Sequence, residues 1–295
     1  ESRIKSLLKR FFYPQEKICV YPALEVIGMS EPAALSVRKK KNSSIVVGLE
    51  LLSQGYAEAF FSAGNTGAVV CGASLVLGTL QGIERPGIAI YIPTLKGRSL
   101  VIDVGANIDP EPNHLLQYAI MASSYFESVL NKKNPKIGLL NIGVEETKGT
   151  DFMRETHRLI SESNLKENFL GNIEGKDLFS GKCDIIVCDG FVGNVALKVS
   201  ESMLDFALNL FKSSLKNNPV GLLGFGLMSL GLGQIRRKID YTEYGGALLL
   251  GINGIVIIGH GRSNPKAIKN ALRVAKEEVE RKVNDKILKA LKLNY

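Results

Sequence analysis

Short apolar runs rich in β-branched residues alternate with longer stretches of helical periodicity along this chain. The runs predict strands at 17–21, 59–62, 88–93, 99–104, 137–141, 168–172, 184–187 and 255–258. The periodic stretches predict helices at 1–12, 43–52, 68–77, 114–130 (capped by Asn113), 151–162 and 195–215, and a last helix from Pro265. Repeated alternation of this kind is typical of an α/β fold with a largely parallel sheet.

Polar, glycine-rich turns follow most of the predicted strands. They contain the residues that we select as candidates for catalysis or for binding phosphate and substrate: Ser62, Asn65, Thr66, Gly67, Asp103, Asn107, Thr147, Lys148, Gly193, Asn194 and His260. The carboxyl ends of parallel strands meet at one crevice, so we expect these turns to converge there. Turn chemistry alone explains Gly, Asn and Asp in such places, but it does not require Lys148 beside Thr147. The set therefore favours a site for an anion.

The turn at 188–194 joins a predicted buried strand to the start of a long predicted helix. Gly190 and Gly193 let the chain turn tightly, and the free N–H groups of the first helical turn are expected to face an anion. Asn194 either caps the helix or directs its amide at a substrate. Alternatively, these residues only end a strand and cap a helix.

The segment 195–240 differs from the rest of the chain. Its first part has an apolar face broad enough to be buried against both the domain and a second subunit. Its middle is uncharged, lies between basic flanks, and is shorter than the ~20 residues that span a bilayer. These features fit an apolar tip that inserts into one leaflet of an anionic membrane. A buried loop or a dimer contact is the alternative. The predicted tip residues are Leu222, Leu223, Phe225, Leu227 and Met228.

The composition suits one large α/β domain or two small ones, since 45% of the 295 residues are hydrophobic and 22% are charged. The net charge of +8 and the pI near 9.2 serve either simple solubility or binding to an acidic partner, an anionic membrane face or nucleic acid. Nucleic acid ranks last, because aromatic residues make up only 7% of the chain and do not alternate with basic ones. The four cysteines lack metal-ligand spacing, and we expect them to be reduced, buried thiols of a cytoplasmic protein.

Six motifs occur in a characteristic order, at 62–68, 103–107, 141–149, 189–194, 244–247 and 260–261. Together they resemble, over about the whole chain, the bacterial phosphate acyltransferases of phospholipid synthesis (the PlsX family). The strand and loop with which that family usually opens, of the type Asp-Ala-Met-Gly-Gly-Asp-His-Ala-Pro, have no counterpart here. Val192 and Arg262 also stand where the family often has Thr and a small residue.

The resemblance implies a single acyltransferase domain over residues 1–295, with a doubly wound αβα fold like those of phosphate acetyltransferases and isopropylmalate dehydrogenases. It implies that inorganic phosphate attacks the thioester of an acyl carrier protein adduct and gives an acyl phosphate, without a cofactor or a metal. It also implies a homodimer that associates peripherally with the membrane, with 195–240 as the protruding helical dimer element.

The residues offer chemistry that fits this reaction. No Ser/His or Cys/His pair is evident, so direct attack by phosphate is more economical than a covalent enzyme intermediate. Lys148 and the 65–67 turn are expected to hold the phosphate dianion, and Asn194 is expected to stabilise the oxyanion. Basic runs at 38–41 or 236–238 are expected to dock the acidic carrier protein. Two alternatives stay open: a short-chain acyl-CoA:phosphate acyltransferase, and a non-catalytic scaffold at the membrane surface.

Overall fold

A computed structural model describes residues 1–216 and 245–294. Within these residues one mixed sheet has the strand order β1-β8-β7-β2-β3-β6-β4-β5. The strands are β1 (Ala59–Ser62), β2 (Gly87–Thr94), β3 (Gly97–Ile102), β4 (Ile137–Leu140), β5 (Phe169–Ile173), β6 (Ile185–Val187), β7 (Ala247–Leu250) and β8 (Ile255–Ile258). The α-helices are α1 (Ser2–Leu8), α2 (Ala33–Lys39), α3 (Ser44–Ser53), α4 (Thr66–Val76), α5 (Pro112–Leu130), α6 (Asp151–Glu162), α7 (Gly190–Lys216), α9 (Pro265–Glu280) and α10 (Val283–Asn294).

The strands fall into two groups that run in opposite directions. β3, β6, β4 and β5 are successive parallel neighbours. β2 is antiparallel to both β3 and β7, and β7 is in turn antiparallel to β8, which pairs in parallel with β1. It follows that β1, β2 and β8 run opposite to β3, β4, β5, β6 and β7. The sheet is therefore mixed, whereas the sequence pattern led us to expect a largely parallel one.

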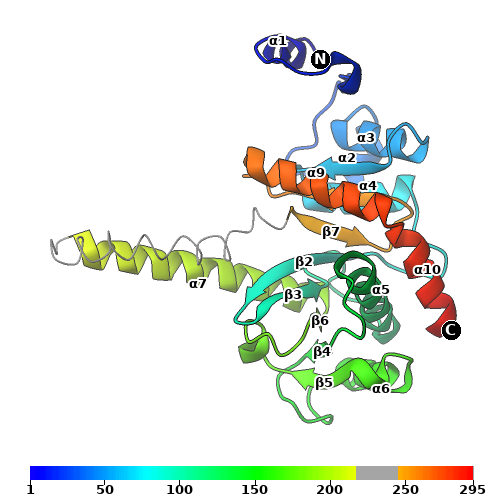
Figure 1. Ribbon diagram of the computed structural model, residues 1–295, viewed down its shortest axis with the longest axis vertical. Helices are drawn as coiled ribbons and strands as arrows, with labels where there is room; N and C mark the ends of the chain where they lie inside the picture. Colours follow the sequence, from blue (N-terminus) through cyan, green and yellow to red (C-terminus); the bar gives the residue numbers. More distant parts are fainter. Residues whose placement is uncertain (217–244, 295) are drawn as a thin grey trace.

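Helices cover both faces of the sheet, which confirms the predicted αβα fold (Figure 1). Successive strand residues point to opposite faces, so Leu100 and Ile102 belong to one core whereas Val101 belongs to the other. The first core is closed by α5, α6, α9 and α10, and the second by α2, α3 and α4.

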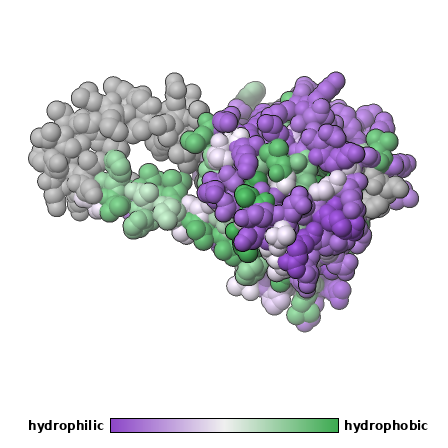
Figure 2. All heavy atoms as spheres, turned by 90° about the horizontal axis from the view of Figure 1, so that it is seen from below, coloured by the Kyte–Doolittle hydropathy of each residue, from purple (hydrophilic) through white to green (hydrophobic). Residues whose placement is uncertain are grey.

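Helix α7 leaves the body of the molecule and projects away from it (Figure 1). Figure 2 shows apolar residues gathered along this projection, whereas most of the visible body is hydrophilic. The exposed apolar side chains of α7 are Phe191, Val192, Val195, Val199, Met203, Leu204, Phe206, Leu208, Leu210 and Phe211. The predicted membrane tip lies outside the described residues. Among those described, no helix combines the length and the apolar character needed to cross a bilayer.

Several local predictions are wrong. Residues 17–21 form no strand, because the short 3-10 helix Gln15–Lys17 is followed by unpaired extended chain. Strand β7 went unpredicted. Helix α5 is capped by Glu111 rather than by Asn113. Finally, Cys19 is exposed and Cys71 is half-buried, so only two of the four cysteines are buried thiols.

Candidate functional site

Three neighbouring parallel strands bring three of the predicted turns to one edge of the sheet. Ile102 at the end of β3 and Leu139 in β4 are both in register with Val187 at the end of β6. The turns that follow these strands are 103–107, 141–149 and 188–194. Lys148 therefore lies in the turn after β4, and Asn194 lies in the first turns of the helix that follows the adjacent parallel strand β6.

Asp103 is fully buried and holds its own loop together. Its Oδ1 atom accepts hydrogen bonds from the N–H groups of Ile88 (3.0 Å), Gly105 (3.1 Å) and Ala106 (3.0 Å). Its Oδ2 atom accepts from the N–H of Asn107 at 2.7 Å. Burial raises the pKa of Asp103, and these backbone hydrogen bonds act in the opposite direction. These contacts make Asp103 a shaping residue of the loop, whereas the sequence suggested direct contact with substrate.

Asn107 fastens the same loop to two other elements. Its side-chain amide donates to the hydroxyl of Tyr118 on α5 (2.7 Å) and to the carbonyl oxygen of Pro86 (2.6 Å). The carbonyl oxygen of Asn107 accepts the N–H of Gly190, the first residue of α7, at 2.8 Å. The loop at 103–107 therefore holds the start of α7 in place, and we call it the clamping loop.

Backbone N–H groups in the first turn of α7 already donate hydrogen bonds to other groups of the protein. Asp189 caps the helix, because its Oδ1 atom accepts the N–H of Val192 at 2.8 Å. The N–H of Gly190 is bound by Asn107. The expectation that these N–H groups stay free for an anion is therefore wrong for Gly190 and Val192. Asn194 lies within the helix, so the alternative in which it caps the helix is also wrong.

Asn194 faces the clamping loop from the first turns of α7. It is half-buried, and a Cβ built on Gly105 would lie 3.4 Å from its Nδ2 atom. Gly105 has a φ of +134°, a conformation that disfavours other residues. The side-chain amide of Asn194 thus lies beside the backbone of this loop, at the edge of the sheet that also carries the 141–149 turn.

The backbone of Lys148 is fixed while its ammonium group is exposed. Its N–H donates to the carbonyl oxygen of Glu145 at 3.0 Å, and its own carbonyl oxygen accepts the side-chain amide of Asn141 at 3.2 Å. Gly143 lies against the stem of the lysine, since a Cβ there would come within 2.9 Å of its Cγ atom. Thr147 is exposed next to it. This turn offers a positioned cation and a hydroxyl group.

The remaining candidates follow β1 and β8, which run in the opposite direction. Ser62 is the last residue of β1, Asn65, Thr66 and Gly67 follow that strand, and His260 follows β8. Because the carboxyl ends of these strands leave the opposite edge of the sheet, the expectation that all turns share one edge is wrong for them. Ser62 accepts the N–H of Gly64 at 3.2 Å, and the Nδ1 atom of His260 accepts the N–H of Arg262 at 3.0 Å.

Asn65 caps α4 and is buried there. Its Oδ1 atom accepts the N–H of Ala68 at 3.0 Å, and its amide donates to the carbonyl oxygens of Gly28 and Met29, both at 3.1 Å. Asn65 is therefore a structural residue of the turn. The N–H groups of Thr66 and Gly67 have no partner among residues 1–216 and 245–294, and these two groups remain available to an anion.

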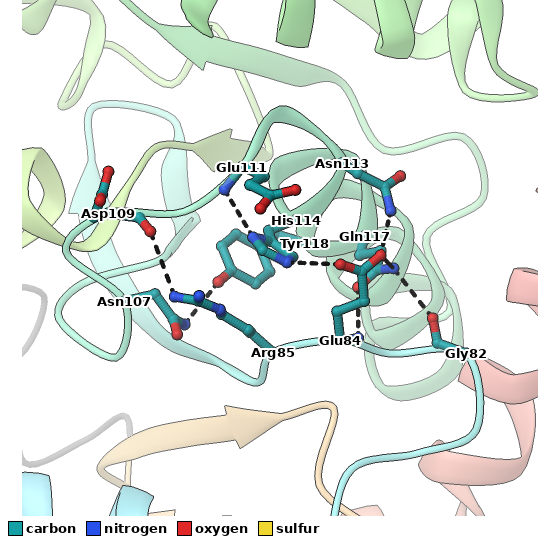
Figure 3. Close-up of polar contacts among 10 residues, drawn as sticks. All are labelled: Gly82, Glu84, Arg85, Asn107, Asp109, Glu111, Asn113, His114, Gln117 and Tyr118. Carbon is teal, nitrogen blue, oxygen red and sulfur yellow. Dashed lines mark hydrogen bonds and ion pairs between the residues drawn. The ribbon is translucent and has the colours of Figure 1, made fainter.

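A polar network around the buried side chains of His114 and Gln117 lies next to the clamping loop, and it was not predicted from the sequence (Figure 3). The Nδ1 atom of His114 accepts the N–H of Glu111 at 2.8 Å, so its proton sits on Nε2, which contacts Glu84 at 2.9 Å. Gln117 accepts the N–H of Glu84 at 3.0 Å. The spacing of Glu111 and His114 is that of a capping box, which is the signal that predicts this helix start.

The family model described as "Fatty acid synthesis protein" matches residues 1–286. The chain belongs to this family. Three curated relatives, all named "Phosphate acyltransferase", cover nearly the whole chain. The relative from Halothermothrix orenii is 45% identical over 283 residues, which are 96% of this chain and 85% of the relative. The one from Dictyoglomus turgidum is 47% identical over 292 residues, or 99% and 87%. The one from Desulfitobacterium hafniense is 48% identical over 290 residues, or 98% and 86%.

Solved structures show that this member of the fatty acid synthesis protein family shares its fold with phosphotransacetylases. A phosphotransacetylase from Streptococcus pyogenes superposes with a TM-score of 0.55 at 19% identity, and covers 84% of this chain and 74% of its own. The EutD phosphotransacetylase from Staphylococcus aureus has the same TM-score at 14% identity, with 99% and 84% coverage. The similarity confirms the predicted fold.

Proposed function

We propose that this chain transfers the acyl group of an acyl carrier protein thioester to inorganic phosphate and so supplies acyl phosphate for phospholipid synthesis. The observation that carries this proposal is the identity of 45% to 48% with relatives named phosphate acyltransferase, which extends over 96% of this chain or more. The protein acts in the cytoplasm, bound peripherally to an anionic membrane surface.

Phosphate is the nucleophile of the proposed reaction. One of its oxygens forms a bond to the thioester carbonyl carbon, the carbon–sulfur bond breaks, and the departing thiolate takes a proton to become the free thiol of the carrier. The thiol group of Cys188 does not compete as a nucleophile. It donates to the carbonyl oxygen of Asp103 at 3.2 Å, and burial raises its pKa well above the ordinary value.

Lys148 and Asn194 have separate roles in this step. The exposed ammonium group of Lys148, with the hydroxyl of Thr147, holds the phosphate dianion against the carbonyl carbon. The side-chain amide of Asn194 stabilises the oxyanion that develops on the carbonyl oxygen. The adjacent parallel strands β4 and β6, which precede these two residues, support the pairing. The free N–H groups of Thr66 and Gly67 supply a second place for phosphate or for the thioester.

The projecting α7 serves as the interface of a homodimer and as the base of the membrane-binding tip. A hollow of about 360 Å³ on this helix is lined by Lys198, Val199, Ser202, Met203 and Phe206. Exposed apolar patches of this kind are typical of protein or membrane contacts. The interface would cover the first part of α7, and the tip residues from Leu222 to Met228 would enter the membrane.

The basic run at 38–41 is the proposed docking surface for the acidic carrier protein. Lys40 already pairs with Glu31 at 2.7 Å, which leaves Arg38, Lys39 and Lys41 for the carrier. These side chains extend from the end of α2. Long-range attraction between this run and an acidic carrier would accelerate docking.

The test is phosphate-dependent release of carrier thiol from a purified long-chain acyl carrier protein adduct. We expect release only when both phosphate and the enzyme are present. A matched acyl-CoA thioester serves as the second donor, and preference for short acyl-CoA would favour the alternative acyltransferase. Binding to anionic vesicles without any phosphate-dependent thioester loss would show a scaffold and would refute the proposed reaction.

A further inference from the structure

A basic cavity lies at the amino ends of β4 and β6, away from the candidate site at their carboxyl ends. Its volume is about 490 Å³, within the range of small-molecule sites. Its walls come from the hairpin between β2 and β3, from the residues that precede β4 and β6, and from the turn around Gly181. No proposed step of the acyl transfer uses this part of the molecule.

The backbone around the cavity is held in place by contacts between distant segments. The N–H of Leu95, at the tip of the hairpin, donates to the carbonyl oxygen of Phe179 at 2.9 Å. Gly181, at a φ of +73°, lies so close to the hairpin that a Cβ there would come within 2.8 Å of the Cβ of Lys96. The buried hydroxyl of Ser99 donates to the carbonyl oxygen of Cys183 at 2.6 Å. The walls are therefore fixed before any ligand binds.

The cavity carries more positive than negative charge. Five of its lining residues are cationic and two are acidic, namely Lys96, Arg98, Lys132, Lys136 and Lys182 against Asp177 and Asp184. The carboxylate of Asp184 binds Lys132 at 2.6 Å and also accepts the N–H of Lys136 at 2.9 Å. Asp177 lies 3.8 Å from Lys182. Both carboxylates are thus already engaged.

Three of the five cationic side chains that line the cavity are left without a carboxylate partner in the described part of the chain. Among the described residues, no carboxylate lies within ion-pair distance of Lys96, Arg98 or Lys136. Arg98 is held in position because its guanidinium group lies over the ring of Tyr91, 4.5 Å from the ring centroid. Like charges that share one concave space repel one another, and a multiply charged anion relieves that repulsion. Phosphate groups suit this set, since Arg and Lys are their usual partners.

We propose that this cavity is a second anion site that binds a small ligand with two or more phosphate groups. The concave shape and the single cluster of charge favour a compact polyanion over the broad surface of an acidic protein. The site is separate from the proposed phosphate site at Lys148.

The experiment is calorimetric titration of the full chain with inorganic tripolyphosphate at low ionic strength. We expect saturable binding that weakens as salt is added. Lys96→Ala combined with Arg98→Ala is expected to weaken it at least tenfold. A second pair, Lys96→Ala with Lys136→Ala, leaves the contact of Arg98 with Tyr91 intact and should have a similar effect. Lys286→Ala with Lys289→Ala removes the same charge from the exposed face of α10 and should change binding little.

Lys148→Ala distinguishes binding in the cavity from binding at the proposed phosphate site, because tripolyphosphate should still bind this variant. Loss of binding in Lys148→Ala but not in the cavity variants would place the ligand in the catalytic turn and overturn the proposal. Equal binding by the cavity variants and the wild type would also overturn it. Binding of poly-glutamate in the absence of any tripolyphosphate binding would show a protein-docking surface instead.

Discussion

Gly193 lies directly against the main chain of Asp103. A Cβ built on Gly193 would come within 1.9 Å of the carbonyl oxygen of Asp103, and within 2.9 Å of the Sγ atom of Cys188. The thiol of Cys188 donates to the same carbonyl oxygen at 3.2 Å. Since the closest contact is with backbone, no side-chain rotation relieves it. The first turn of α7 therefore reaches the end of β3 only with glycine at position 193.

Gly193→Ala should destabilise the protein severely. Within a helix, alanine is normally favoured over glycine by about 1 kcal/mol, so without the clash this substitution would stabilise α7. The contact at 1.9 Å reverses the sign, and we expect a loss of at least about 3 kcal/mol in the free energy of unfolding. Urea denaturation measures this. Gly175→Ala is the control, because no atom lies within 4 Å of a Cβ at that position. Equal stability of the two variants would disprove the close approach.

The strands and helices were largely predictable because their signals are local. The aromatic run at 59–62 and the β-branched run at 255–258 predicted β1 and β8 at their observed bounds. The apolar run at 17–21 predicted a strand that does not form, because these residues pair with no strand. Its sequence resembles a strand, but a strand also needs a partner, which a single run does not reveal.

The direction of the strands was not predictable from local pattern. β2 pairs with β7, although about half of the chain separates these two strands in sequence. This pairing sets the direction of β7, and through β7 that of β8 and β1, relative to the strands that precede Lys148 and Asn194. The turns of the candidate site were recognisable from their residue types, but their arrangement at two edges depends on this long-range pairing. The cap at Asp189 was recognisable, because Asp is a preferred residue before a first helical turn.

Lys148→Ala should lower turnover at least tenfold while leaving the fold intact. In the proposed reaction the exposed ammonium group of Lys148 holds the phosphate, so its loss should weaken binding in the transition state without opening a cavity. The measurement is phosphate-dependent thiol release together with the melting temperature. Lys166→Ala, at an exposed lysine after α6, is the matched control. Turnover equal to that of the control would remove Lys148 from the site.

Asn194→Ala should also lower turnover at least tenfold, through the loss of an oxyanion donor. Asn194→Asp tests the same role with nearly the same shape, because a carboxylate accepts hydrogen bonds and repels an oxyanion. We expect Asn194→Asp to be no more active than Asn194→Ala, with the loss in kcat rather than in KM for the acyl donor. If Asn194→Asp retained wild-type kcat, the amide would have only a packing role beside Gly105.

Met203→Asp combined with Phe206→Asp should convert the proposed homodimer into a monomer. Both side chains are more than half exposed on α7, at 61% and 62%, and an interface that buries them would desolvate the two new charges. Sedimentation equilibrium measures the change. Leu272→Asp on α9 serves as the control, since this residue is 56% exposed on another part of the surface. A mass that is unchanged in the α7 variant would exclude this helix from the interface.

Glu278 should make the protein less stable as the pH rises. Its side chain is 3% exposed, and its Oε1 atom has no hydrogen-bond partner among the described residues. Burial, and secondarily the nearby Glu277, raises the pKa of Glu278 to about 8. An unfolded chain has a glutamate pKa of about 4.3, so between these values the folded state keeps a proton that the unfolded state has lost. Stability therefore falls from about pH 4 to about pH 8 and then levels off.

Glu278→Gln should abolish this slope, because the amide is neutral at every pH. We expect the variant to gain on the order of a few kcal/mol over the wild type at pH 9 and to differ little from it at pH 4. Urea denaturation across this range gives both values. Glu280→Gln removes an exposed carboxylate from the same helix and should keep the wild-type slope. A slope that persists in Glu278→Gln would assign the pH dependence to another group and would mean that Glu278 is hydrated or paired when it ionises.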